Sequence, residues 1–270
     1  MEKKVIGFIG TGNMARAVLK GVYDSELREK YYLYGYDKSV RAVNYCRKNF
    51  KMIKAKNAGD IVEESDIIFL AVKPGDFKGA AEGLKKIKKN SLLAVSVMAG
   101  ISVKSIKESL PSGTGVIRVM PNTPAFLGEG ACGYAAGKGV SAVKEKEAVR
   151  ILETFSRVCE KFSEEMLDAV TAVSGSGPAY FFYFAEAMMK AAADMKMRPA
   201  AAKKLIAQTM YGSAKMIMQT GEPIEKLRMK VTSKGGTTQS AVDVMKKNNV
   251  DKIIRRAVRA AEKRAKELGN

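Results

Sequence analysis

The stretch VIGFIGTGNMA, residues 5–15, decides the fold of this chain. An apolar segment ends in Gly10-x-Gly12-x-x-Ala15, and a helical pattern begins directly after it. Gly10 permits a sharp turn, Gly12 has no Cβ to block phosphates, and Ala15 lets the helix pack close to a sheet. The free N–H groups at the helix start face an anion in such a turn. The stretch therefore predicts a site for a dinucleotide's pyrophosphate in preference to an ordinary turn between strand and helix.

Length, composition and charge limit the class of protein. The 270 residues, 46% of them hydrophobic, suffice for two domains, and we expect no membrane span and no signal peptide. The net charge is +19, but its lysines are spread along the chain, so we expect a solvated basic surface and no nucleic-acid or membrane partner. Histidine is absent, which excludes an imidazole base, triad or metal ligand.

The three cysteines, Cys46, Cys132 and Cys159, lie far apart in the sequence. They have neither the C-x-x-C spacing of a zinc site nor the density of a disulfide framework. We therefore expect no metal site and a cytoplasmic location.

The rhythm of apolar runs changes near the middle of the chain. A doubly wound, mostly parallel Rossmann-like sheet is predicted from strands at residues 5–9, 32–36, 67–72, 92–97 and 115–119, a hairpin-like strand at 130–135 and a helix at 141–159. Helices are predicted at residues 166–197, 199–219, 223–230, 238–247 and 251–268. The fold class is therefore α/β over residues 1–162, followed by an all-α domain over residues 163–270. Its many apolar, methionine-rich faces predict association with a partner subunit.

Unusual loops follow the predicted strands. AVKP (71–74) and MPNTP (120–124) lie at carboxyl strand ends, where open parallel sheets bind ligands, although ordinary turns use the same residue types. Asp37 ends the second strand about 20 residues after the glycine turn, the place of an acid that binds the ribose of NAD. Lys38, Ser39 and Arg41 could instead hold the 2′-phosphate of NADP, and Asp37 could cap the next helix. The residues favour NADH and leave NADPH open.

Two further glycine-rich segments lie in the helical half. VTSKGGTT (231–238) places two glycines among four hydroxyl residues before a helix, a candidate cradle for a small carboxylate, although Thr237 or Thr238 could simply cap that helix. SGSGPAY (174–180) is a break where the backbone can approach a ligand closely.

Five segments together resemble the pyrroline-5-carboxylate reductase family: residues 7–15, 71–74, 120–124, 174–180 and 232–238. The resemblance implies a Rossmann domain and a helical, substrate-binding domain that interlocks with its twin in a homodimer, often building larger rings. It also implies reduction of 1-pyrroline-5-carboxylate to L-proline by NADPH or NADH, the last step of proline biosynthesis. Lys234 departs from the proline common in the family, and Asp37 departs from the usual phosphate site.

The resemblance carries roles onto particular residues. Those implied for the cofactor are Gly10, Thr11, Gly12, Asn13, Met14, Ala15, Ala71, Val72, Lys73, Pro74, Asn122 and Thr123. Their position after the second strand adds Asp37, at the ribose, and Lys38, at a 2′-phosphate, to the predicted cofactor residues. Those implied for the substrate are Ser233, Gly235, Gly236, Thr237 and Thr238, with Thr238 as the catalytic residue at the imine nitrogen.

Two other functions use the same fold. The chain could reduce another cyclic imine or a β-hydroxy acid, although the hydroxy-acid enzymes use a helix-borne lysine that has no obvious counterpart here. It could also be a nucleotide sensor or nucleic-acid-binding protein that kept the fold. The second anion cradle, at residues 231–238, argues against a sensor, because a sensor has little need of it. Salt-dependent retention on DNA would indicate nucleic-acid binding.

Overall fold

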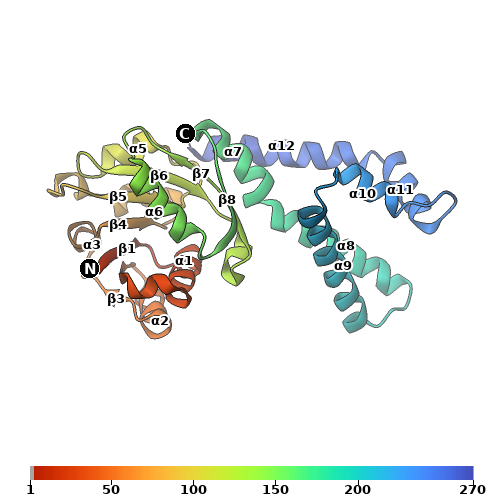
Figure 1. The fold of residues 1–270 in the computed structure, drawn as a ribbon, viewed down its shortest axis with the longest axis horizontal. Coiled ribbons are helices and arrows are strands. Elements are labelled where there is room, and N and C mark those ends of the chain that lie inside the picture. The colour runs from red at the N-terminus through yellow and green to blue at the C-terminus, as the bar shows by residue number, and fades with distance from the viewer. Residues whose placement is uncertain (1–2, 270) are drawn as a thin grey trace. The chain divides into compact units, whose positions relative to one another are not determined.

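The computed structural model describes residues 3–269, and its first part is an α/β sheet structure (Figure 1). The strands are β1 (Lys4–Ile9), β2 (Tyr31–Tyr36), β3 (Ile53–Lys54), β4 (Ile67–Leu70), β5 (Leu93–Ser96), β6 (Gly115–Met120), β7 (Gly130–Ala136) and β8 (Ser156–Lys161). They form one sheet in the order β3-β2-β1-β4-β5-β6-β7-β8. Neighbouring strands run parallel except for β6 and β7. The predicted doubly wound, mostly parallel sheet is confirmed.

Helices cover both faces of the sheet. One face carries α1 (Asn13–Asp24), α2 (Val40–Phe50) and α6 (Ala142–Leu152), and the other carries α3 (Ala58–Glu64), α4 (Phe77–Ala80) and α5 (Val103–Ser109). Side chains alternate between the faces as a strand requires: Ile6 and Phe8 enter the first core and Ile9 the second. Phe8 stacks on Phe69 of β4, with 5.4 Å between the ring centroids.

Two features of this part differ from the sequence prediction. The predicted helix at residues 141–159 is wrong in its second half, because α6 ends at Leu152 and Ser156–Lys161 form β8 beside β7. The Thr154 hydroxyl donates to the carbonyl of Ile151 (2.7 Å) at this helix end, and pairing with β7 overrides local helix propensity. The two-residue strand β3 was not predicted, since its side chains are exposed and carry no buried alternation.

The chain divides into two compact units by its internal contacts. Residues 3–178 and 261–269 form the first unit, and residues 179–260 form the second. The first unit includes α7 (Leu167–Val170) and a π-helical turn, η6 (Thr171–Gly175), as well as the end of α12 (Val250–Gly269), where Ala265 is buried. The contacts thus place residues 163–178 with the sheet, and the division into domains 1–162 and 163–270 stays a prediction.

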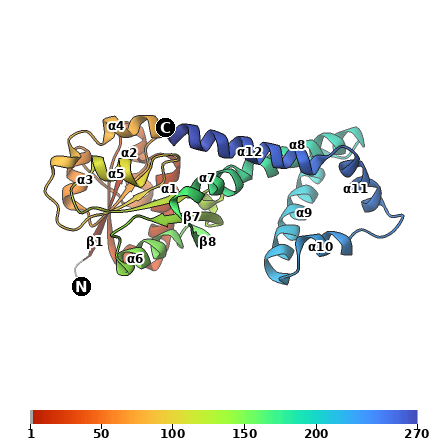
Figure 2. The ribbon, with the colours of Figure 1, turned by 90° about the horizontal axis from the view of Figure 1, so that it is seen from above.

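The second unit is helical, as predicted, and has almost no core of its own. Its remaining helices are α8 (Gly177–Asp194), α9 (Pro199–Thr220), α10 (Ile224–Lys230) and α11 (Thr237–Lys247), drawn from green to blue in Figure 2. Of the described residues 179–260, only Ala192, Ala202 and Ile206 are buried. Large apolar side chains such as Phe182 and Tyr183 are 67% and 74% exposed. An apolar surface of this extent is typical of a subunit interface.

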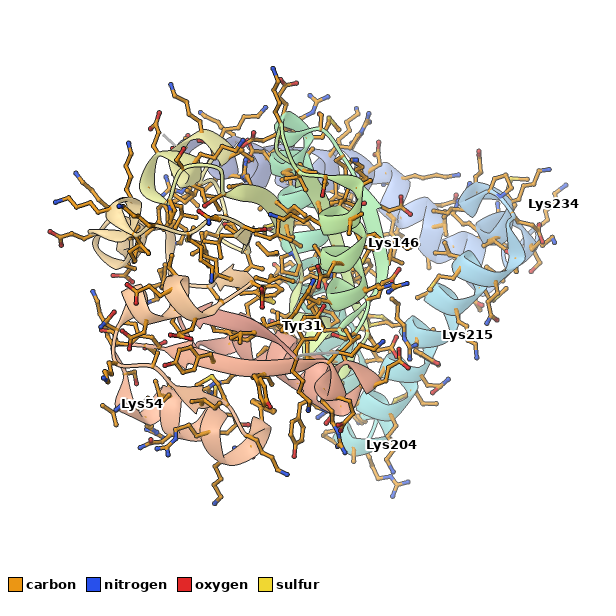
Figure 3. The ribbon with its side chains drawn as sticks, turned by 60° about the vertical axis from the view of Figure 1, so that its left-hand side comes forward. Tyr31, Lys54, Lys146, Lys204, Lys215 and Lys234 are labelled. Carbon is orange, nitrogen blue, oxygen red and sulfur yellow. The ribbon has the colours of Figure 1, made fainter. Side chains whose placement is uncertain are left out.

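The basic charge is distributed over both units. Figure 3 labels Lys54 and Lys146 of the first unit and Lys204, Lys215 and Lys234 of the second, all of them exposed side chains. Within the described residues, no helix is both long enough and apolar enough to span a membrane.

Candidate active site

The glycine turn has the geometry that an anion site requires. Gly10 has φ +93°, and a Cβ there would lie 2.6 Å from the Ala71 carbonyl oxygen, so only glycine fits. Gly12 is the residue before α1, and no described atom lies within 4 Å of the place a Cβ would take. No described side chain caps α1, and its first turn contains no acidic residue. The N–H groups of that turn are therefore available to a negatively charged ligand.

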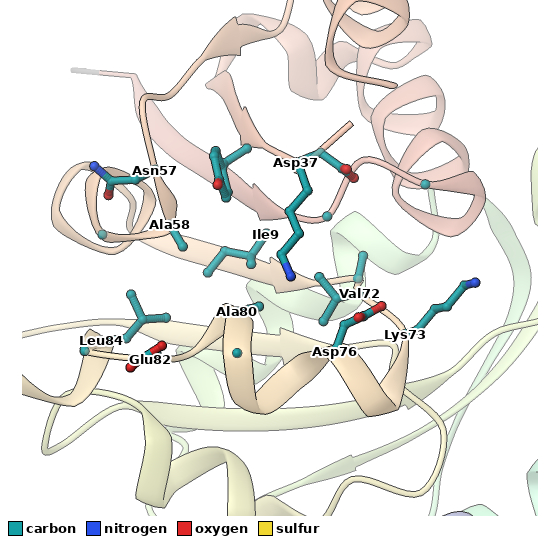
Figure 4. A pocket seen from close by; sticks show the side chains of 18 of the residues that line it. Ile9, Asp37, Asn57, Ala58, Val72, Lys73, Asp76, Ala80, Glu82 and Leu84 are labelled. Carbon is teal, nitrogen blue, oxygen red and sulfur yellow. The ribbon is translucent and has the colours of Figure 1, made fainter. Parts of the chain in front are cut away.

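A cavity of about 750 Å³ opens beside this turn, at the carboxyl ends of β1, β2 and β4 (Figure 4). This is where the chain reverses its direction of strand addition, the usual ligand site of such sheets. Of the residues predicted for the cofactor, those that line it are Gly10, Gly12, Asp37, Lys38, Ala71, Val72 and Lys73. Residues that sequence reasoning missed line the rest: Ile9, Tyr36, Asn57, Ala58, Gly59, Asp76, Gly79, Ala80, Glu82, Gly83, Leu84 and Ile87.

The other residues predicted for the cofactor do not line the cavity. Thr11 and Ala15 are fully buried beneath the turn, and Asn13 is exposed beside it. Met14 and Pro74 also lie outside the lining. Ala15 thus supports the turn through packing, and Thr11 supports it through hydrogen bonds to Asp37.

Asp37 ties the glycine turn to the end of β2. Its Oδ2 accepts hydrogen bonds from the Thr11 N–H (2.6 Å) and the Thr11 hydroxyl (3.2 Å), and its Oδ1 accepts one from the Ser39 N–H (2.8 Å). Ser39, not Asp37, caps α2, through the Ala42 N–H (3.2 Å). Asp37 is therefore a carboxylate held at the cavity wall, and the exposed side chain of Lys38 is next to it in the lining.

A buried thiol lies under the same turn. The Cys46 Sγ is 3.8 Å from the Thr11 carbonyl oxygen, which also accepts a hydrogen bond from Arg16 Nε (3.2 Å). Burial raises the pKa of Cys46, so its thiol stays neutral and acts as packing.

Asn122 and Thr123, predicted at the nicotinamide, follow β6 and lie outside the cavity lining. The Asn122 amide donates to the carbonyl and the hydroxyl of Ser174 (3.4 Å each), and its Oδ1 accepts from the Ala131 N–H (3.0 Å). Asn122 therefore joins the ends of β6 and β7 to the π-helical turn η6, while Thr123 is exposed.

The second glycine segment forms a tight turn before α11. The Gly236 N–H donates to the Ser233 carbonyl (3.0 Å), and Gly235 has φ +75°, as the third residue of a type II turn requires. Lys234 occupies the second position, where such turns favour proline. A Cβ on Gly236 would lie 2.5 Å from Ser233 Oγ, so a larger residue there requires the Ser233 side chain to rotate.

Two of the backbone N–H groups that were predicted to bind the substrate carboxylate are already hydrogen-bonded within the turn. The Gly235 N–H already donates to Gln239 Oε1 (2.6 Å), and the Gly236 N–H closes the turn. Within the described residues, α11 has no side-chain cap and no acid in its first turn. Of the predicted residues, Ser233, Thr237 and Thr238 keep backbone N–H groups that donate to no described residue, and the Thr238 hydroxyl makes no hydrogen bond to any described residue either.

A Rossmann sheet with an uncapped glycine turn, followed by a helical unit, defines the class of dinucleotide-dependent oxidoreductases. Residues 5–100 match the family model of the coenzyme F420-dependent NADP oxidoreductases, and residues 164–268 match that of pyrroline-5-carboxylate reductase dimerisation. The pyrroline-5-carboxylate reductase of Escherichia coli is 36% identical over 269 residues, 99% of each chain. The chain belongs to the pyrroline-5-carboxylate reductase family.

Solved structures of this family share the whole fold. A pyrroline-5-carboxylate reductase from Coxiella burnetii has a TM-score of 0.90 and 30% identity, and covers 100% of both chains. A Plasmodium falciparum pyrroline carboxylate reductase with NADP bound has a TM-score of 0.87 and 28% identity, again over 100% of both chains.

Proposed function

We propose that this enzyme reduces 1-pyrroline-5-carboxylate to L-proline with NADH or NADPH, the last step of proline biosynthesis. The observation that carries the proposal is the pair of uncapped helix starts, α1 and α11, each preceded by a glycine turn. A dinucleotide and a small carboxylate each need one such anion site, and a nucleotide sensor has no use for the second. Full-length similarity to the reductases of this family supports the same substrate.

The residues of the chain bind and orient, since the nicotinamide, when bound, supplies the hydride. N–H groups at the start of α1 hold the pyrophosphate, and those at Thr237 and Thr238 hold the substrate carboxylate. The Thr238 hydroxyl hydrogen-bonds the imine nitrogen. A neutral threonine is a poor general acid, so Thr238 orients the imine, and the nitrogen is protonated before it binds.

The test is an assay in which racemic 1-pyrroline-5-carboxylate oxidises NADH or NADPH. The loss of nicotinamide absorbance measures the rate. Rapid oxidation that yields L-proline supports the proposal. A folded protein that binds a dinucleotide but oxidises neither contradicts it. Parallel assays with other cyclic imines and β-hydroxy acids then identify the alternative substrate, and salt-dependent retention on DNA identifies a nucleic-acid partner.

We further propose a preference for NADH, set by Asp37. A carboxylate at the ribose repels a 2′-phosphate, so Asp37→Ser should raise the NADPH-to-NADH ratio of kcat/KM about tenfold. The ratio is the informative quantity, because loss of the hydrogen bond between Thr11 and Asp37 weakens the binding of both cofactors to the same extent. Asp76→Ser, which removes another carboxylate from the cavity lining, is the matched control and should change the ratio less. An equal ratio in Asp37→Ser and the unmutated enzyme excludes Asp37 from cofactor choice.

We propose that the second unit forms a homodimer, from which larger rings can be built. Its exposed apolar side chains support this, and so does the match to the family's dimerisation model. Tyr183→Lys places a charge on the 74% exposed Tyr183 of α8 and should weaken association about 30-fold or more, measured by sedimentation equilibrium against the 29.3 kDa monomer. Tyr32→Lys, at a 51% exposed tyrosine of the sheet unit, is the control. Equal association of the two variants contradicts the assignment.

We propose a cytoplasmic location as well. All three cysteines are free thiols in the structure, which fits a reducing compartment.

Within the described residues, no cluster of three or more acidic, cysteine or histidine side chains could hold a metal ion.

A further inference from the structure

Two cysteines far apart in the sequence meet on neighbouring strands. Cys132 of β7 and Cys159 of β8 are register partners in a parallel pair, so their side chains leave the same face of the sheet. Their sulfur atoms are 3.2 Å apart. Cys132 is buried and Cys159 is half-buried.

This placement meets the geometric requirements of a disulfide. Adjacent strands lie about 4.8 Å apart, inside the Cα separation of about 4.4–6.8 Å that disulfides span. Closing the sulfur–sulfur distance from 3.2 Å to the length of a bond needs side-chain rotation and little backbone movement. Cys46, in contrast, lies on α2 under the glycine turn, and its Sγ contacts the Thr11 carbonyl oxygen.

We propose that Cys132 and Cys159 form a site of reversible oxidative modification, at which hydrogen peroxide oxidises the two thiols to a disulfide. One sulfur attacks a peroxide oxygen, so that an S–O bond forms, the O–O bond breaks and a first water leaves. The second sulfur then attacks the oxidised sulfur, the S–S bond forms, the S–O bond breaks and a second water leaves. Two electrons pass from the sulfurs to the peroxide, and the two thiol protons leave in the waters. A dithiol reductant reverses the reaction by exchange.

The surroundings of the pair shift the pKa values of the two thiols in opposite directions. The hydrogen bond shared with Cys159 lowers the pKa of Cys132, against the opposing effect of burial. The same shared hydrogen bond and burial raise the pKa of Cys159. Cys132 is therefore the more easily ionised sulfur, and the half-buried Cys159 lies on the accessible side.

The proposed disulfide lies next to Ala131, whose backbone is hydrogen-bonded to Asn122 at the end of β6. Ala131 directly precedes Cys132, and its N–H donates to Asn122 Oδ1 while its carbonyl accepts a hydrogen bond from the Ser174 hydroxyl (3.5 Å). A covalent link from Cys132 to β8 restrains this stretch of β7.

The experiment uses the whole protein and needs no enzyme assay, so its result is independent of the proposed function. The protein is treated with hydrogen peroxide, free thiols are alkylated, and tryptic peptides are analysed by mass spectrometry. We expect titratable thiols to fall from three to one, with a cross-linked peptide pair joining Cys132 and Cys159, an alkylated Cys46, and recovery of all three thiols with dithiothreitol. Both cysteines recovered alkylated, over-oxidised to sulfinic acid, or linked between two protein chains overturns the proposal.

Cys159→Ser is the discriminating variant, because a half-buried position tolerates an oxygen in place of sulfur. Its circular dichroism should match that of the unmutated protein, and its peroxide-treated digest should lack the cross-linked pair. The denaturant midpoint of the first unit should rise on oxidation of the unmutated protein and stay unchanged in Cys159→Ser. An equal rise in both proteins contradicts the assignment to this pair.

Discussion

Gly12→Ala is expected to lower the affinity for both NADH and NADPH about a hundredfold while leaving the protein folded. No described atom lies within 4 Å of the new methyl group, and the backbone at Gly12 (φ −69°) suits alanine. The methyl group instead occupies the approach of the phosphates to the uncapped start of α1. A hundredfold loss corresponds to about 3 kcal/mol of binding free energy. Fluorescence titration with each dinucleotide measures it, and thermal unfolding confirms that the fold is kept.

Two other glycine variants serve as controls for the loss of dinucleotide affinity in Gly12→Ala. Gly75→Ala adds a methyl group at a position equally free of described neighbours and outside the cavity lining, so its dinucleotide affinity should stay unchanged. Gly10→Ala should lower stability as well, because its Cβ meets the Ala71 carbonyl at 2.6 Å in a left-handed backbone. Dinucleotide affinity preserved in Gly12→Ala would remove the glycine turn from the cofactor site.

Thr238→Ala should lower kcat about a hundredfold and leave the dinucleotide dissociation constant nearly intact. The Thr238 hydroxyl has no hydrogen-bond partner among the described residues, so its removal leaves no buried group unpaired and should cost little stability. Losing a hydrogen bond that orients the reacting imine typically costs about 100-fold or more in turnover. Steady-state kinetics with 1-pyrroline-5-carboxylate gives kcat and KM, and titration gives the cofactor affinity.

A second hydroxyl on the same helix provides the control. Ser240 Oγ donates to the Gly236 carbonyl (3.4 Å) and faces its own helix backbone, so Ser240→Ala should keep nearly full turnover. Thr238→Ser keeps the hydroxyl and should recover most of the activity. If Thr238→Ala turns over as fast as Ser240→Ala, Thr238 has no part in the reaction.

The glycine turn is a feature that the local sequence alone predicts. The need for glycine at position 10 arises from one backbone angle and one neighbouring carbonyl, and the spacing to Ala15 reports the packing of a helix on its own strand. Both are short-range requirements, so they are readable without a structure. The positive φ at Gly235 is likewise a requirement of a local turn, although the two glycines had suggested an anion cradle and no particular turn type.

Other features depend on partners that are distant in the sequence. Strand β8 forms because β7 is beside it, which no helix pattern in residues 141–159 could reveal. Asp37 is held by Thr11 and Ser39, although its position after β2 had suggested only a ribose ligand or a helix cap. Gln239 takes the Gly235 N–H, which removes one donor that the glycine motif alone had suggested.

The sequence by itself determined the sheet class, the glycine turn and the helical second half, because each rests on the conformational limits of neighbouring residues and on periodic burial. Only the tertiary structure decided the far wall of the cavity, which Asn57, Ala58, Gly59 and the segment from Asp76 to Ile87 supply, the hydrogen bonds at Asn122 and the proximity of Cys132 to Cys159. These depend on strand order and register, which bring distant segments into contact, and no local pattern encodes that placement.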